Sequence, residues 1–136
     1  MRYLLDTDTL SELMRRAPSP PLLRQLAAVP PDQQATSSIS LGELLYGARR
    51  VPDRSAELLA RIEQTVTANL RVLPFDADAA AEYGALRAQL EQQGVLIGNA
   101  DMQIASIALA RDLVVVTGNV RHFGRVPSLT VANWLV

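Results

Sequence analysis

The feature that most constrains the fold lies at the N-terminal end, where a short apolar run stops abruptly at a carboxylate. Tyr3–Leu5 is followed by Asp6 and three small polar or acidic residues, and then by helix-compatible sequence over residues 10–16. We interpret this as a buried strand that delivers Asp6 to the carboxyl end of a parallel sheet, where α/β proteins bind ligands. Because a lone buried carboxylate is costly unless it is paired or bound to metal, Asp6 should have partners elsewhere in the chain.

Strand and helix patterns alternate along the rest of the chain. Strands are predicted at residues 34–37, 71–75, 113–116 and 129–132, and helical spacing of apolar residues lies between them. Such alternation is typical of βαβ units around a parallel sheet. A length of 136 residues suits one domain. We therefore predict a single α/β domain over residues 1–136, with a parallel sheet of four or five strands flanked by helices.

Composition excludes several kinds of function. The net charge of −1 gives no general attraction to nucleic acid, and all thirteen basic residues are arginine, so no mechanism can use a catalytic lysine. The absence of cysteine excludes disulfides and thiolate metal sites. Asp6, Asp8 and Glu12 interrupt any signal-peptide-like run, and no stretch approaches the ~20 apolar residues that span a bilayer. We expect a cytoplasmic protein with no membrane attachment.

Polar and acidic residues gather where the predicted strands end. Parallel strands all end at one edge of the sheet, and that edge should collect Asp6, Asp8, Ser37, Ser38, Thr117 and Asn119, with Glu43 and Asp101 in the first turns of nearby helices. Converging carboxylates raise one another's pKa values unless a cation neutralises them. Mg²⁺ and Mn²⁺ prefer oxygen ligands. The pattern predicts metal-assisted hydrolysis of a phosphodiester.

Structural roles compete for several of these residues. Asp6 and Asp8 could each simply cap the first helix, which is the preferred explanation of Asp8 but not of Asp6, and Ser40 with Glu43 matches the S-x-x-E capping box. Asp101, one turn into a helix, is favoured there by the helix dipole whether or not it binds metal. His122, the single histidine, is expected in a surface loop, with phosphate contact or proton transfer as the alternatives.

Taken together and in order, these segments resemble the PIN-domain family, specifically the VapC-type ribonuclease toxins of bacterial and archaeal toxin–antitoxin pairs. The matching segments span the whole chain, at residues 4–8, 40–48, 73–76, 97–105, 117–123 and 131–134. The resemblance implies a PIN-like three-layer domain in which Asp6, Glu43 and Asp101 bind metal. Asn119 stands where a fourth acid is often found, so we expect it to orient substrate or water.

The same resemblance implies an Mg²⁺- or Mn²⁺-dependent endoribonuclease toxin that cleaves RNA with metal-activated water. It also implies a homodimer and a cognate VapB-type antitoxin, whose docking groove we expect along residues 41–66. Substrate contacts are expected from Thr117, Arg121 and His122. Phosphates could also meet other arginines, at positions 49, 50, 54 and 125.

Two other readings compete with the nuclease. The D-x-D-x-T opening at Asp6 also occurs in haloacid-dehalogenase-like phosphatases, but those enzymes need a lysine that this chain lacks. A PIN-like module that binds RNA or protein without cutting stays open, because Asn119 replaces the fourth acid. A nuclease assay with added Mg²⁺ or Mn²⁺ would separate this module from the nuclease.

Overall fold

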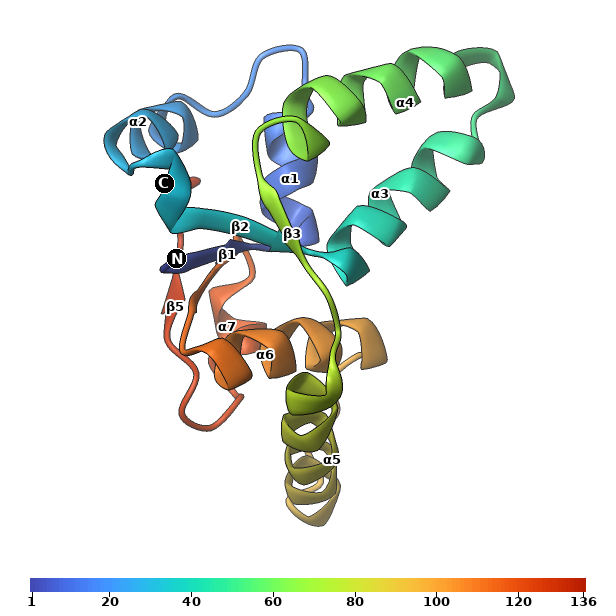
Figure 1. Ribbon diagram of the computed structural model, residues 1–136. Coiled ribbons are helices and arrows are strands. Elements are labelled where there is room, and N and C mark those ends of the chain that lie inside the picture. The colour runs from blue at the N-terminus through green and yellow to red at the C-terminus, as the bar shows by residue number, and fades with distance from the viewer.

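A parallel five-stranded sheet forms the centre of the computed structural model, which describes residues 1–136 (Figure 1). The strand order is β3-β2-β1-β4-β5, and every neighbouring pair is parallel. The strands are short: β1 (Tyr3–Leu5), β2 (Gln34–Ser37), β3 (Arg71–Leu73), β4 (Val114–Val116) and β5 (Val131–Ala132). The predicted α/β class and parallel sheet are confirmed.

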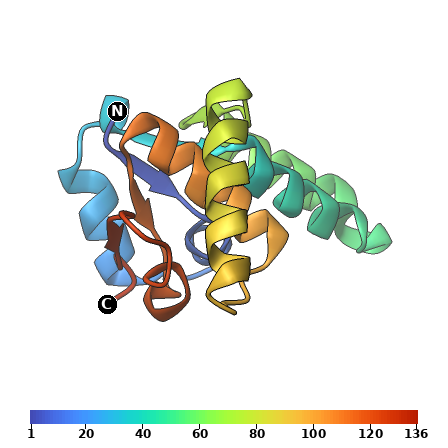
Figure 2. The same ribbon diagram turned by 90° about the horizontal axis from the view of Figure 1, so that it is seen from below.

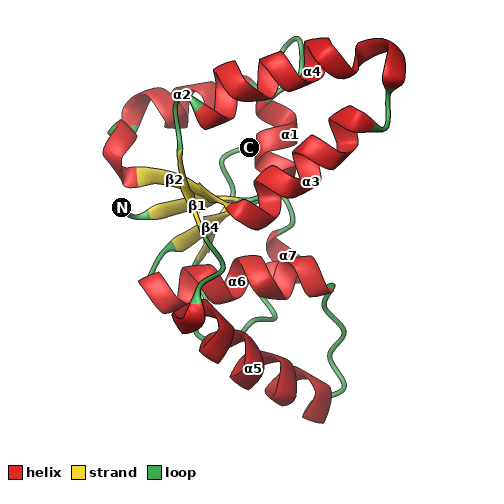
Figure 3. Cartoon of the chain, turned by 45° about the vertical axis from the view of Figure 1, so that its right-hand side comes forward, coloured by secondary structure: helices red, strands yellow, loops and turns green.

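Helices cover both faces of this sheet. On one side lie α1 (Thr7–Leu13), α2 (Pro20–Ala28), α3 (Ser38–Arg49) and α4 (Ser55–Ile62), and on the other lie α5 (Ala77–Gln92), α6 (Asn99–Arg111) and α7 (Val120–Phe123), as Figure 3 shows. Short helical turns at Pro31–Gln33, Pro52–Arg54 and Glu63–Thr67 complete the chain. Helices α3 and α4 form a hairpin that projects beyond the sheet (Figure 2). None of the helices combines the length and the apolar character needed to cross a bilayer.

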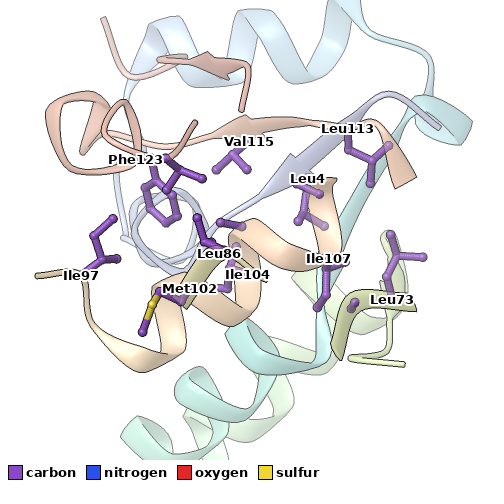
Figure 4. Packing of buried hydrophobic residues seen from close by; sticks show 14 of the residues in the cluster. Leu4, Leu73, Leu86, Ile97, Met102, Ile104, Ile107, Leu113, Val115 and Phe123 are labelled. Atoms are coloured by element: carbon purple, nitrogen blue, oxygen red, sulfur yellow. The ribbon is translucent and has the colours of Figure 1, made fainter. Parts of the chain in front are cut away.

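The central strands are buried on both faces, as expected of a parallel sheet between helical layers. Leu4 and Val115 point toward α5, α6 and α7, where they pack with Ile104 and Phe123 (Figure 4). Leu5 and Val116, the next residue on each strand, join the other cluster under α1 to α4. Successive side chains on a strand point to opposite faces, so each of these short apolar runs supplies both cores.

Two strands pass into helices without a loop, and the residue at each junction becomes the helix cap. Asp6 follows β1, and its Oδ1 accepts a hydrogen bond from Thr9 N at 2.8 Å. Ser37 ends β2, and its Oγ accepts from Ser40 N at 2.9 Å. Each cap satisfies one of the backbone N–H groups that a helix start leaves unpaired.

The predictions that Asp8 caps the first helix and that Ser40 and Glu43 form a capping box are therefore wrong. Asp6 caps α1, and Asp8 lies exposed in the first turn of that helix. Helix α3 begins at Ser38, three residues earlier than the pattern indicated, so Glu43 falls in the second turn and cannot complete a capping box with Ser40. Helix capping therefore does not account for an acid at Glu43, whereas it does account for one role of Asp6.

Candidate active site

The candidate site lies at the carboxyl ends of β1 and β4. Leu5 pairs with Val116 across these two strands, so the residues that follow, Asp6 and Thr117, are neighbours at the edge of the sheet. The start of α3 and the short helix α7 lie beyond the ends of these strands, to the right of the sheet in Figure 3. The topology therefore brings together the ends of β1 and β4 with the starts of α3 and α7.

Asp6 is the most unusual group at this edge. Only 3% of the residue is exposed, and burial raises the pKa of its carboxyl from the ordinary 3.8 to about 6. Hydrogen bonds from the Thr117 side chain and from the backbone N–H of Thr9 lower the pKa and offset only part of that effect. No arginine or histidine lies within ion-pair distance of Asp6. The protein thus buries a carboxylate without supplying a cation for it.

Thr117 links Asp6 to the loop that precedes α7. The residue is completely buried, its side chain lies close enough to Asp6 to lower the pKa of that carboxyl, and its Oγ1 accepts from Asn119 N at 2.9 Å. It therefore supports Asp6 and the loop, and does not present its hydroxyl to solvent. Asn119 is exposed and makes no side-chain capping bond to α7, so its amide is free to meet a substrate or a water molecule.

Glu43 is hydrogen-bonded to Thr7, the residue that follows Asp6. Thr7 Oγ1 donates a hydrogen bond to Glu43 Oε1 at 2.6 Å and lies 3.1 Å from Ser40 Oγ. Because Thr7 directly follows Asp6, this contact holds an exposed carboxylate close to the buried one. The sequence pattern did not single out Thr7, since its partner is 36 positions away and no local spacing reveals it.

Asp101 is held by the single histidine. His122 Nε2 lies 2.8 Å from Asp101 Oδ2, and Arg125 Nη2 lies 3.0 Å from His122 Nδ1. The prediction that His122 occupies a surface loop is wrong: it lies in α7, and 20% of its side chain is exposed against 36% for Asp101. Both ring nitrogens have protein partners, which leaves neither free for a phosphate oxygen.

The chemical type of the candidate ligands Asp6, Glu43 and Asp101 suits a hard divalent cation. All three are carboxylates, and Asp6 is a buried acid whose charge the protein leaves unneutralised; Mg²⁺ and Mn²⁺ favour such oxygen ligands. The acids are not a finished cage, because no group of three or more histidine, aspartate or glutamate side chains is close enough to hold a metal ion. The metal-binding roles of Asp6, Glu43 and Asp101 stay predictions.

The arginines that were expected to meet phosphate divide into two groups. Arg121 and Arg125, together with Asn119 and His122, line a wholly polar cavity of about 350 Å³ beside the site. The others lie on the projecting α3–α4 hairpin, at positions 49, 50 and 54. The structure thus places only the first group next to Asp101.

A second cavity of about 300 Å³ opens on the other side of Glu43. It runs between α1, α3 and α4, and its lining is mainly apolar: Met14, Leu44, Ala48, Leu58 and Ile62, with the polar residues Thr7, Ser11 and Glu43. Six of its nine lining residues fall within the stretch over residues 41–66 that was predicted to hold a partner, and the other three come from α1 and its C-terminal end. An acidic site and an apolar groove therefore share the Glu43 side chain.

Comparison with known proteins places this geometry in a family. The sequence matches the PIN domain family over residues 3–129. It is 35% identical over 136 residues to the tRNA(fMet)-specific endonuclease VapC of Salmonella typhimurium, covering 98% of each chain. It is 34% identical over 134 residues to Ribonuclease VapC2 of Rickettsia felis, again covering 98% of each.

Solved structures show the same fold at full length. The VapBC complex of Salmonella typhimurium bound to DNA matches with a TM-score of 0.91 at 34% identity, covering 98% of both chains. VapBC2 of Rickettsia felis, bound to a DNA fragment from its promoter, matches with a TM-score of 0.90 at 32% identity, covering 98% of this chain and 99% of that one. The predicted PIN-like fold and the predicted resemblance are confirmed.

Proposed function

Because this chain belongs to the PIN-domain family and is a VapC-type endoribonuclease toxin of a type II toxin–antitoxin system, we propose that it cleaves RNA with Mg²⁺ or Mn²⁺ held by Asp6, Glu43 and Asp101. Asp6 and Asp101 are the principal ligands, and Glu43 is a third ligand or positions the attacking water. When bound, the cation supplies an activated water and neutralises charge that develops on the phosphate.

The burial of Asp6 is the observation that carries this proposal. An acid at 3% exposure with its pKa raised to about 6 is destabilising unless something else in the working protein compensates it. A bound divalent cation would do so, with Glu43 and Asp101 as the further carboxylates that would hold it. A purely structural cap has no need of such burial, because a cap such as Asp76, in contact with Arg111, works at the surface with a lowered pKa.

The remaining residues handle the substrate. Asn119, exposed at the start of α7, orients the scissile phosphate or the water. Arg121, which makes no ion pair in the protein, contacts a backbone phosphate of the RNA. Thr117 acts from below by holding Asp6 and the Asn119 loop. The initiator tRNA is the first substrate to test, since the Salmonella relative is named for it.

The partner proposed for the apolar groove is a VapB-type antitoxin. The relatives in the solved complexes are toxin–antitoxin assemblies, and here the groove between α1, α3 and α4 ends at Glu43. An apolar antitoxin segment seated in it would lie close enough to cover the acidic site. A homodimer and a cytoplasmic location complete the proposal, and sedimentation of the purified complex would test the dimer.

A nuclease assay tests the function. The antitoxin-free protein, incubated with initiator tRNA, is expected to cut in the presence of Mg²⁺ or Mn²⁺ and to stop when EDTA is added. Asp6→Asn should abolish cutting, whereas Asp8→Asn, which alters an exposed acid two residues away, should not. RNA that is bound but never cut under any metal would instead support the non-cleaving module.

A further inference from the structure

Three hydrogen-bonded contacts join a backbone carbonyl to the candidate ligand Asp101. Arg125 Nη2 donates to Leu96 O at 2.8 Å and lies 3.0 Å from His122 Nδ1. On the far side of the ring, His122 Nε2 lies 2.8 Å from Asp101 Oδ2. The residues come from the connector before α6, from the first turn of α6, and from α7 and its C-terminal flank. A chain of contacts across three segments constrains each member more than a single pair would.

The chemistry of arginine decides which ring nitrogen of His122 carries the proton. A guanidinium has N–H donors and no acceptor, so its contact with Nδ1 requires Nδ1 to be the acceptor. The proton of the neutral ring must then be on Nε2, from where it is donated to Asp101 Oδ2. The Phe123 ring packs edge-on against the imidazole at 5.7 Å between centroids and limits its rotation.

We infer that His122 is a positioning residue for Asp101, and that Arg125 selects its tautomer. The bond from Nε2 occupies Oδ2 of Asp101 and restrains rotation of the carboxylate, so that Oδ1 would be the oxygen free to bind a cation. This inference rests on the proposed function, because Asp101 is taken as a metal ligand. Groups that orient a ligand from behind in this way typically change metal affinity or activity by about 10–100-fold when they are lost.

The tautomer can be measured directly, since His122 is the single histidine of the chain. Long-range ¹H–¹⁵N NMR of the metal-free protein at about pH 8.5, where a free imidazole is neutral, will show one imidazole. The expected spectrum is that of the Nε2–H tautomer in wild type, and of a mixture of tautomers in Arg125→Ala. Arg121→Ala removes an equal charge from the same region but none of the three hydrogen-bonded contacts, so it should leave the spectrum unchanged. A wild-type ring protonated on Nδ1, or a freely averaging one, would overturn the inference.

Metal affinity tests the consequence for Asp101 without any cleavage. Mn²⁺ titrated calorimetrically into the metal-free protein is expected to bind about 10–100-fold more weakly to His122→Ala than to wild type. His122→Gln should restore most of the affinity, because its amide nitrogen is as many bonds from the backbone as Nε2. His122→Asn, whose amide nitrogen is one bond shorter, should not. Circular dichroism will establish that each variant is folded.

The outcomes separate this inference from the proposed function. If wild type binds Mn²⁺, Asp6→Asn abolishes binding and His122→Ala binds as tightly as wild type, then the metal site stands and the positioning role is wrong. If wild type shows the Nε2–H tautomer but binds no Mn²⁺, then the metal role of Asp101 fails, and the role of His122 toward a metal fails with it. Equal affinities for His122→Gln and His122→Asn would also contradict the inference, since only one of them reaches Oδ2.

Discussion

Replacing Asp6 with asparagine should stabilise the metal-free protein while abolishing its nuclease activity. The substitution removes the charge that burial opposes and keeps an oxygen that can accept the hydrogen bond from Thr9 N at the start of α1. Asparagine is as good a helix N-cap as aspartate. The amide can also meet the Thr117 hydroxyl. The variant therefore loses little of what the wild-type side chain contributes to folding.

The size of the effect follows from the raised pKa of Asp6. A difference between the ordinary value of 3.8 and about 6 in the folded protein corresponds to roughly 3 kcal/mol, since each pKa unit is worth ~1.4 kcal/mol. Asp6 is almost fully buried, so solvent screening does not reduce this figure as it would at the surface. We expect Asp6→Asn to raise the free energy of unfolding by about 2–3 kcal/mol near neutral pH.

The gain should depend on pH in a defined direction. Between pH 3.8 and about 6 the folded protein keeps the Asp6 proton that the unfolded chain has already released. Stability contributed by this group is therefore complete below pH 3.8 and is lost as the pH rises through about 6, at up to ~1.4 kcal/mol per pH unit. The difference between Asp6→Asn and wild type should vanish near the lower end of this window and reach its plateau above the upper end.

Urea unfolding across this pH range, with EDTA present, measures the difference. Asp8→Asn is the matched control: Asp8 is exposed on the same first helical turn, so its substitution should change the free energy of unfolding by less than about 1 kcal/mol. Excess Mg²⁺ should stabilise wild type and leave Asp6→Asn unaffected. A metal-free Asp6→Asn protein that is less stable than wild type at neutral pH would refute the reasoning, since Asp6 would then be acting as a stabilising cap.

Three further predictions concern single positions. Glu43→Gln should lower the initial rate of RNA cleavage by at least about 10-fold without lowering the melting temperature; an unchanged rate would exclude Glu43 from the site. Gly124→Ala should cost about 1–3 kcal/mol in urea unfolding, because its Cβ would meet the backbone oxygen of Val120 at 2.8 Å, while Gly84→Ala, with nothing within 4 Å, should be neutral or stabilising. Ser37→Ala should cost about 1 kcal/mol by removing the cap of α3, and no loss would show that the cap is dispensable.

The strands and the general order of elements could be predicted because their signal is local. The run at Val114–Val116 is apolar throughout, which is typical of a strand buried on both faces, and it lies inside the sheet between β1 and β5. Helix starts were harder to predict, because periodicity marks the apolar face and not the first residue. Where a strand passes straight into a helix, as at Asp6 and Ser37, the cap is the last residue of the strand or the residue directly after it.

The contacts within the site could not be predicted from spacing. Thr7 meets Glu43 across 36 positions and His122 meets Asp101 across 21, so both depend on how α3, α6 and α7 pack. The sequence did indicate which acids should gather at the edge of the sheet, since parallel strands end there together. It gave no sign that His122, expected in a loop, would be placed behind one of those acids.

Anomalous diffraction from crystals soaked in Mn²⁺ will show whether Asp6 and Asp101 bind the cation, because it locates the ion relative to the carboxylates. One strong peak is expected in contact with Asp6 and Asp101, with Glu43 bound directly or through a water, and no such peak is expected in Asp6→Asn crystals treated in the same way. An active enzyme whose Mn²⁺ peak lies away from Asp6, or persists unchanged in the Asp6→Asn crystals, would contradict the metal-binding role of Asp6.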